Sequence, residues 1–180
     1  MTRRRDGAAP LTVLTPILTG AEQDLTEYLE NIPPGEGSPF RRLPGTHFAR
    51  WVVIDRPRGD YQGAPVPPTS LLSSYLLFTS TFDSTVAEHV EELRIRLGAE
   101  ADEVWRPCVG YPGRRQQRKF RQYFTHNRIR EDIWHRAYDA TVQEIRAALD
   151  LRRRHIEFAL RSQRLDDQEL HRQFLEEFGG

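Results

Sequence analysis

The sequence predicts an α+β domain of ferredoxin-like design, with a βαββαβ order and additional helices at the C-terminus. Segments with strand-like and helix-like patterns follow one another as strand, helix, strand, strand, helix, strand, which is the split βαβ arrangement with an antiparallel sheet. The 180 residues are also enough for one domain with a closed core, and no internal repeat indicates a second. We therefore expect a single domain at residues 11–180, preceded by a flexible arm at residues 1–10.

The first strand and the first helix of this order lie before residue 33. Residues 11–19 alternate β-branched and aliphatic side chains in the manner of a strand. Residues 22–32 follow as a helix, because Leu25, Leu29 and Ile32 recur at spacings of four and three residues and so share one face. Two prolines and a glycine then end this helix.

A long proline-rich connection separates the second strand from the third. Residues 46–55 have the strongest strand pattern in the chain, because aromatic and β-branched side chains follow one another, and we expect this strand to be central in the sheet. Residues 56–70 contain too many prolines and glycines for a regular element, and long loops of this kind are often lids or dimer arms. Residues 71–81 supply the third strand.

The second helix and the fourth strand complete the predicted order. Thr85 and Glu88 have the spacing of a capping box, which predicts the start of a helix with an apolar stripe. Residues 114–127 predict a basic helix, and residues 129–138 predict the fourth strand. A capping-box spacing recurs at the head of a long helix that begins near Thr141.

A last short helix is expected at residues 167–178, with Leu170, Phe174 and Phe178 as its docking face. Helices in this topology cover one face of the sheet, so the other face needs a cover. Two such sheets commonly meet face to face in a dimer and enclose a barrel-like cavity. We expect a homodimer of the dimeric α+β barrel type.

Composition argues against several classes of protein. The 26 basic and 26 acidic residues cancel, so no overall field attracts nucleic acid or anionic lipid. The only cysteine is Cys108, which excludes a disulfide within the chain and gives no support for an oxidising compartment. The apolar runs are far too short to span a bilayer, and the N-terminus lacks the pattern of a signal peptide. We expect a cytoplasmic protein without membrane contact.

Three segments resemble a known family: PGTHFARWVV at residues 44–53, YLLF at residues 75–78 and CVGYPG at residues 108–113. They are similar to mostly uncharacterised bacterial ferredoxin-like proteins, akin to dimeric α+β barrels and distantly similar to the N-terminal half of dye-decolourising peroxidases. The resemblance extends from about residue 11 to the C-terminus. It implies a range of functions: cofactor-free oxygenases, isomerases, decarboxylases, haem enzymes and non-catalytic modules.

The same resemblance bears on peroxidase chemistry. In the peroxidases a second half of the domain carries the proximal haem ligand, and at 180 residues this chain is too short to contain it. We therefore leave the cofactor open, with haem and no cofactor as the two alternatives. His47 or His126 would be the axial ligand of a haem.

Candidate functional residues lie on the second and third strands. Side chains alternate along a strand, so His47 and Trp51 share one face while Arg50 lies on the other. His47 can serve as a general acid or base, or it can simply hydrogen-bond to a loop at the strand end. Arg50 can hold a substrate carboxylate, or it can pair with an acidic residue across the sheet or the dimer. We assign catalytic roles to His47 and Arg50, with Trp51 and Tyr75 as pocket walls.

A basic stretch at residues 114–130 contains no acid, and its aromatic residues alternate with arginines. Such a pattern can bind single-stranded nucleic acid by stacking and phosphate contacts. The alternative is a solvated helix face, with the aromatic residues as its buried stripe. We assign Arg118 to ligand binding. Cys108 is either a reactive thiolate beside Arg106 or an inert buried residue, and no spacing indicates a metal site.

The leading hypothesis is a small-molecule enzyme, with tailoring or detoxifying chemistry that is oxidative or independent of a cofactor. Its pocket is expected on the open face of the sheet. One alternative is a haem-binding protein of the same fold. The other is a non-catalytic interaction or nucleic-acid-binding module that uses the basic stretch. The substrate and the reaction are not specified by any motif.

Overall fold

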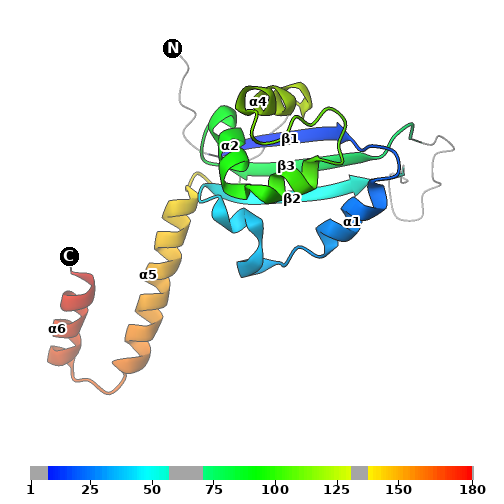
Figure 1. Cartoon of the computed structure of the whole chain (residues 1–180). Coiled ribbons are helices and arrows are strands. Elements are labelled where there is room, and N and C mark those ends of the chain that lie inside the picture. The colour runs from blue at the N-terminus through cyan, green and yellow to red at the C-terminus, as the bar shows by residue number, and fades with distance from the viewer. Residues whose placement is uncertain (1–7, 57–70, 131–137, 180) are drawn as a thin grey trace, which may run out of the picture. The chain divides into compact units, whose positions relative to one another are not determined.

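Two units make up the computed structural model, which describes residues 8–56, 71–130 and 138–179 (Figure 1). The first unit, Met1–Val142, contains an antiparallel sheet with helices and confirms the predicted α+β class. The second unit, Gln143–Gly180, is helical. The single domain at residues 11–180 stays a prediction. Most of the predicted arm at residues 1–10 lies outside the described residues, and the first strand already begins at Ala9.

The sheet has four strands in the order β2-β3-β1-β4, and every neighbouring pair is antiparallel. Their bounds are β1 (Ala9–Pro16), β2 (Thr46–Ile54), β3 (Tyr75–Phe82) and β4 (Arg128–Ile129). The short β4 pairs with Thr12 and Val13 of β1. Most of the predicted fourth strand at residues 129–138 lies outside the described residues.

The predicted central position of the second strand is wrong, because β2 lies at an edge of the described sheet. The central strands are β1 and β3, whose side chains alternate between fully buried and half-buried. On β2, Ala49, Trp51 and Val53 pack against the core, while Phe48 and Val52 on the other face are exposed. The aromatic and β-branched residues of β2 therefore lie on both faces of an edge strand, and neither face is completely buried.

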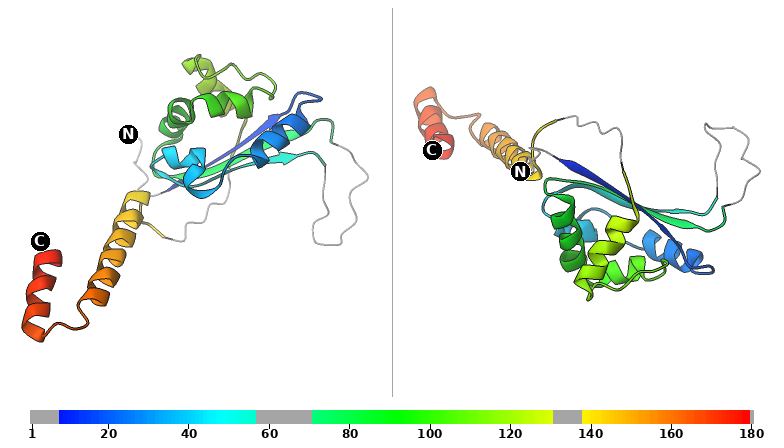
Figure 2. Two further views of the ribbon diagram at one scale, coloured as in Figure 1. Left: turned by 60° about the horizontal axis from the view of Figure 1, so that its bottom comes forward. Right: turned by 90° about the horizontal axis from the view of Figure 1, so that it is seen from above.

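The helices of the first unit lie on one side of the sheet, as the rotated views show (Figure 2). They comprise α1 (Glu22–Glu30), α2 (Val86–Glu92), α3 (Ala99–Trp105) and α4 (Gln117–His126), with two short 3-10 turns, η1 (Gly35–Gly37) and η2 (Pro39–Arg42). A π-helical segment, η3 (Leu93–Leu97), links α2 to Gly98. Gly98 has a φ of 62°, which favours glycine, and it allows the turn into α3. The predicted helices at residues 22–32 and 114–127 are confirmed, and so is the helix predicted to start at the Thr85 capping box.

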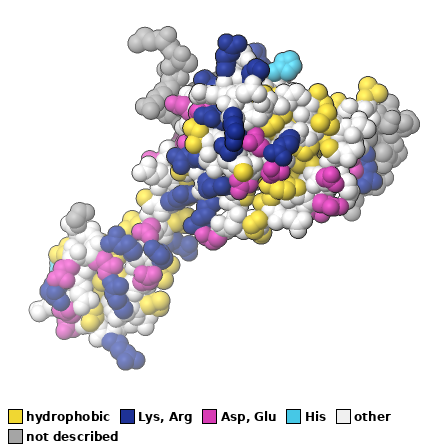
Figure 3. All heavy atoms as spheres, viewed as in Figure 1, with side chains coloured by type: hydrophobic (Ala, Val, Ile, Leu, Met, Phe, Trp, Pro, Cys, Tyr) yellow, Lys and Arg dark blue, Asp and Glu magenta, His cyan; other side chains and the backbone are white. Residues whose placement is uncertain are grey.

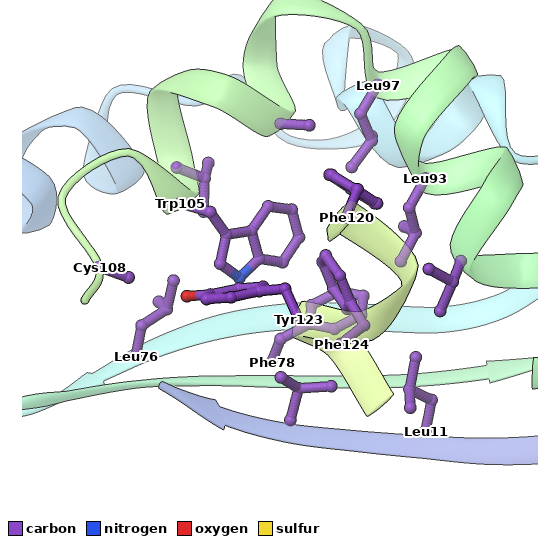
Figure 4. Close-up of a cluster of buried hydrophobic side chains, with 14 of the residues drawn as sticks. Leu11, Leu76, Phe78, Leu93, Leu97, Trp105, Cys108, Phe120, Tyr123 and Phe124 are labelled. Carbon is purple, nitrogen blue, oxygen red and sulfur yellow. The ribbon is translucent and has the colours of Figure 1, made fainter. Parts of the chain in front are cut away.

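The core lies between this helical layer and the inner face of the sheet (Figure 4). Every second residue of β1 and β3, such as Val13 and Phe78, points into it and is fully buried. Phe120 and Phe124 of α4 approach it from the other side, and Trp105 packs edge-on against both Phe78 and Phe124. The aromatic stripe of the basic segment is therefore a buried packing surface.

The second unit is a pair of helices, α5 (Val142–Arg161) and α6 (Asp167–Phe178), as predicted for this part of the chain. Phe158 of α5 packs edge-on against Phe174 and Phe178 of α6, with ring centroids 5.9 and 5.6 Å apart. The expected docking face of the last helix thus meets α5. No helix among the described residues is both long enough and apolar enough to cross a membrane.

Candidate functional site

A β-bulge near the start of β2 determines where His47 lies. The pairing of β2 with β3 slips by one residue between Thr46 and Phe48, which takes His47 out of the regular alternation. Its Nε2 lies 2.6 Å from Oδ1 of Asp83, the residue that follows β3, and only 7% of the His47 side chain is exposed. The hydrogen bond to a loop, one of the two interpretations of His47, is therefore present.

Asp83 is fixed by two further hydrogen bonds, one to its side chain and one from its backbone. Its Oδ2 accepts a hydrogen bond of 2.8 Å from the backbone N–H of Val142, and its own N–H donates to the carbonyl oxygen of Gly45. The ring of Tyr138 lies 6.0 Å from the ring of His47. Because the carboxylate of Asp83 accepts from Nε2, a neutral His47 ring carries its lone pair on Nδ1. Nδ1 is therefore the ring nitrogen that can accept a hydrogen bond from a bound group.

Arg50 and Tyr75 both lie on the open face of the sheet. In the register of β2 with β3, Arg50 faces Thr79 and Tyr75 faces Ile54, so the two side chains are about 13 Å apart along the strands. Arg50 is exposed, and its guanidinium carbon lies 5.9 Å from the centre of the Phe48 ring. It forms no ion pair with any other residue that the structure describes.

Trp51 lies on the opposite side of β2 and belongs to the core. Its ring is 4.1 Å from that of Phe40, and it packs edge-on against Trp105 at 5.9 Å. The indole N–H of Trp51 is buried and has no hydrogen-bond partner within the described part of the chain. The structure therefore separates Trp51 from Arg50 and Tyr75, and the regular alternation of β2 explains this separation.

Arg118 lies on the outer face of α4, where basic side chains gather (Figure 3). A shallow hollow on this face is lined by polar and basic residues, namely Gln117, Arg118, Arg121, Gln122, Thr125 and His126. The aromatic residues of α4 all point into the core, so none of them can stack on a base. The solvated-face interpretation of the basic stretch is confirmed for α4. A second hollow lies between α5 and α6, and none of His47, Arg50, Trp51 and Tyr75 lines either one.

His89 is a polar residue whose burial the sequence analysis missed. It is fully buried in α2, with its ring stacked on Phe82 at 3.8 Å and Nε2 3.0 Å from the hydroxyl oxygen of Ser80. Burial lowers the pKa of His89 to about 3, so the ring is neutral. The spacing of His89 in the sequence could have predicted this burial. His89 lies three residues after Val86 and four before Leu93, which places it on the apolar side of the helix.

Cys108 is the inert buried residue of its two interpretations. It is 2% exposed, and burial raises the pKa of its thiol, which disfavours the reactive thiolate. The loop that follows it is tied down by Asp102, which accepts hydrogen bonds from the hydroxyl of Tyr111 and from the backbone and side chain of Arg114. The segment from Cys108 to Arg114 therefore has a structural role at the edge of the core.

Asp83 and Tyr138 are the residues near His47 that sequence analysis did not identify. Asp83 lies two residues before the Thr85 cap, where small polar residues are common for helix capping alone, so no signal marked it. Within the described segments, no group of three or more histidine, cysteine, aspartate or glutamate residues could hold a metal ion. Comparison of the chain with protein-family models, with curated proteins and with solved structures finds no match.

Proposed function

We propose that this protein is a small-molecule enzyme that binds an organic carboxylate on the open face of its sheet, with a second copy of the chain as the cover. The observation that carries the proposal is the environment of Arg50. This guanidinium is exposed on a sheet face lined largely by apolar side chains, and no described acidic side chain neutralises it. A planar fork of donors in such surroundings is suited to a carboxylate.

The topology supports the kind of fold in this proposal. The order β2-β3-β1-β4, with antiparallel neighbours and helices on one side, is compatible with a ferredoxin-like domain of the dimeric α+β barrel type. It is also compatible with the distant similarity to the N-terminal half of dye-decolourising peroxidases. We place the protein in the cytoplasm, since its only cysteine has no possible partner in the chain.

His47 supplies the proposed chemistry. It is three residues before Arg50 on the same strand, or about 10 Å along it, a span that suits a small organic acid. Two polar groups at this odd spacing face opposite sides of a regular strand, and the bulge at His47 relaxes that restriction. In this proposal Arg50 holds the carboxylate, and the His47–Asp83 pair removes a proton from the substrate and returns it.

A thermal-shift screen of small aromatic and aliphatic carboxylates tests the carboxylate site. A ligand at a hundredfold excess over its Kd stabilises the folded state by about 2.7 kcal/mol, which raises Tm by roughly 5 to 10 °C in a chain of this size. We expect the shift to disappear in Arg50→Gln and to persist in Arg115→Gln, a matched loss of one exposed arginine in the turn before α4. An equal shift in Arg50→Gln and the unmodified protein contradicts the proposal.

A haem-binding protein of the same fold is the second candidate, and one observation favours it. Histidines that ligate metals usually donate their other ring N–H to a carboxylate, and His47 has this partner in Asp83. His126 lies on the exposed outer face of α4 and has no such partner in the described structure. A titration with haemin that gives a Soret band dependent on His47, and not on His126, supports this candidate. A titration without a Soret shift removes it.

A further inference from the structure

We infer that α5 holds two copies of this chain together by packing antiparallel against α5 of the second copy. The inference rests on the homodimer of the proposed function and is independent of its chemistry. The feature that carries it is an apolar stripe on α5, made of Ile145, Leu149, Ile156 and Leu160. We call these residues the α5 stripe.

The α5 stripe lies on a different side of the helix from α6. At 100° per residue the four side chains fall within about 60° of one another, and the centre of this arc is about 170° from Phe158, which packs on α6. Leu149, Ile156 and Leu160 are 57%, 49% and 65% exposed. Hydrophobic side chains reach the surface of this unit between charged ones (Figure 3). The helix thus has one apolar side for α6 and a second for another partner.

The size of the helical unit indicates that it needs such a partner. Chains below about 40 residues usually require disulfides, a metal ion or association to fold stably, and this unit consists of residues 143–180. The only cysteine, Cys108, lies outside it, and the described residues include no metal-binding cluster. Association with a second copy is a source of stability that a unit of this size can use.

The spacing of the stripe identifies the partner as a second copy. In a two-fold contact each residue i faces residue j of the other copy, and j faces i. The midpoint of Ile145 and Leu160 in the sequence lies between residues 152 and 153, and the midpoint of Leu149 and Ile156 lies at the same place. An antiparallel pairing about this point places Ile145 of each copy against Leu160 of the other, and Leu149 against Ile156, so every apolar residue of the stripe meets another.

The charges beside the stripe alternate in sign along one flank as Arg146, Asp150, Arg153 and Glu157. Their midpoint lies between residues 151 and 152, one residue from the midpoint of the stripe. The antiparallel pairing of the stripe therefore brings Arg146 near Glu157 of the other copy, and Asp150 near Arg153, each with an offset of about 3 Å along the helix axes that long side chains can span. On the other flank Arg152 lies near the two-fold axis, where its long stem can carry the guanidinium to solvent.

Sedimentation equilibrium of the full chain tests this contact. We expect twice the monomer mass for the unmodified protein and at least a hundredfold weaker association for Leu149→Glu and for Ile156→Glu, since each places a charge in the apolar seam. The matched control is Ile95→Glu in η3, where a side chain of similar exposure, 59%, lies outside the helical unit. Arg146→Glu and Glu157→Arg should each weaken association, and the double variant should restore it.

The outcomes separate this inference from the proposed function. A monomeric unmodified chain overturns the inference and the homodimer together, while the carboxylate test of Arg50 stands on its own. A dimer that survives Leu149→Glu overturns the α5 contact alone, and its loss in Phe48→Glu would then point to the open sheet face. Dissociation in the two stripe variants, with unchanged far-UV circular dichroism and charge-swap rescue, supports the contact.

Discussion

Single residues in this chain are polar where the surrounding packing is apolar, and His89 is the clearest case. Its ring fills space next to Phe82 as an aromatic residue would, and only one ring nitrogen has a hydrogen-bond partner among the described residues. Such a ring folds neutral, since a buried cation without a counterion is costly. The protein's stability therefore depends on the protonation of a residue that takes no part in the proposed chemistry.

Stability should fall as the pH is lowered from about 6.5 towards 3. The folded pKa of His89 is about 3 and the unfolded value is about 6.5, so between them the unfolded chain binds the extra proton. The contribution of neutral His89 to the free energy of unfolding is complete above pH 6.5. Below pH 6.5 the free energy of unfolding falls by up to about 1.4 kcal/mol per pH unit. Urea unfolding at pH 7 and pH 5 should show a loss of about 2 kcal/mol, and His89→Gln should reduce that loss. An equal loss in His89→Gln and in the exposed control His126→Gln would count against this mechanism.

At the scale of elements, the sequence predicted best those features whose contacts join residues close together in the chain. The capping box of Thr85 and Glu88 is present as predicted, since its hydrogen bonds span three residues. The alternation of β1 and β3 likewise marked their buried faces. The edge position of β2 and the His47–Asp83 contact were not predictable, because both depend on pairing between segments more than 30 residues apart. The bulge at His47 is equally invisible to a pattern of period two.

The cap at Thr85 should contribute measurably to stability because α2 carries two buried residues, His89 and Val90. Its hydroxyl accepts from the N–H of Glu88, and the carboxylate of Glu88 accepts from the N–H of Thr85. Thr85→Ala removes the first of these hydrogen bonds and should cost about 1 kcal/mol in denaturant unfolding. Ser84→Ala is the matched control, since the hydroxyl of Ser84 donates only a long hydrogen bond of 3.5 Å, to the carbonyl oxygen of Thr85, among the described residues, and its loss should change stability by much less. Equal effects of the two variants would show that the cap contributes nothing.

At the scale of the whole molecule, the core and the helical unit have separate sources of stability. Every residue of the main buried cluster lies between Leu11 and Phe124, so none comes from the helical unit. At the start of α5, the backbone N–H of Val142 donates to Asp83 of the candidate site. Among the described residues of the helical unit, only Phe158 and Ser162 have buried side chains, so the stability of this unit depends on what its helices contact.

A chain that ends after Arg146 should therefore keep the α+β unit folded and lose the association through α5. It retains the Val142 contact and the complete cluster around Trp105, so its near-UV circular dichroism and the cooperativity of its unfolding should match those of the full chain. Sedimentation should give a monomer, because three of the four stripe residues are removed. A truncated chain without near-UV signal would mean that the helical unit stabilises the sheet, and a truncated dimer would move the contact between copies to the α+β unit.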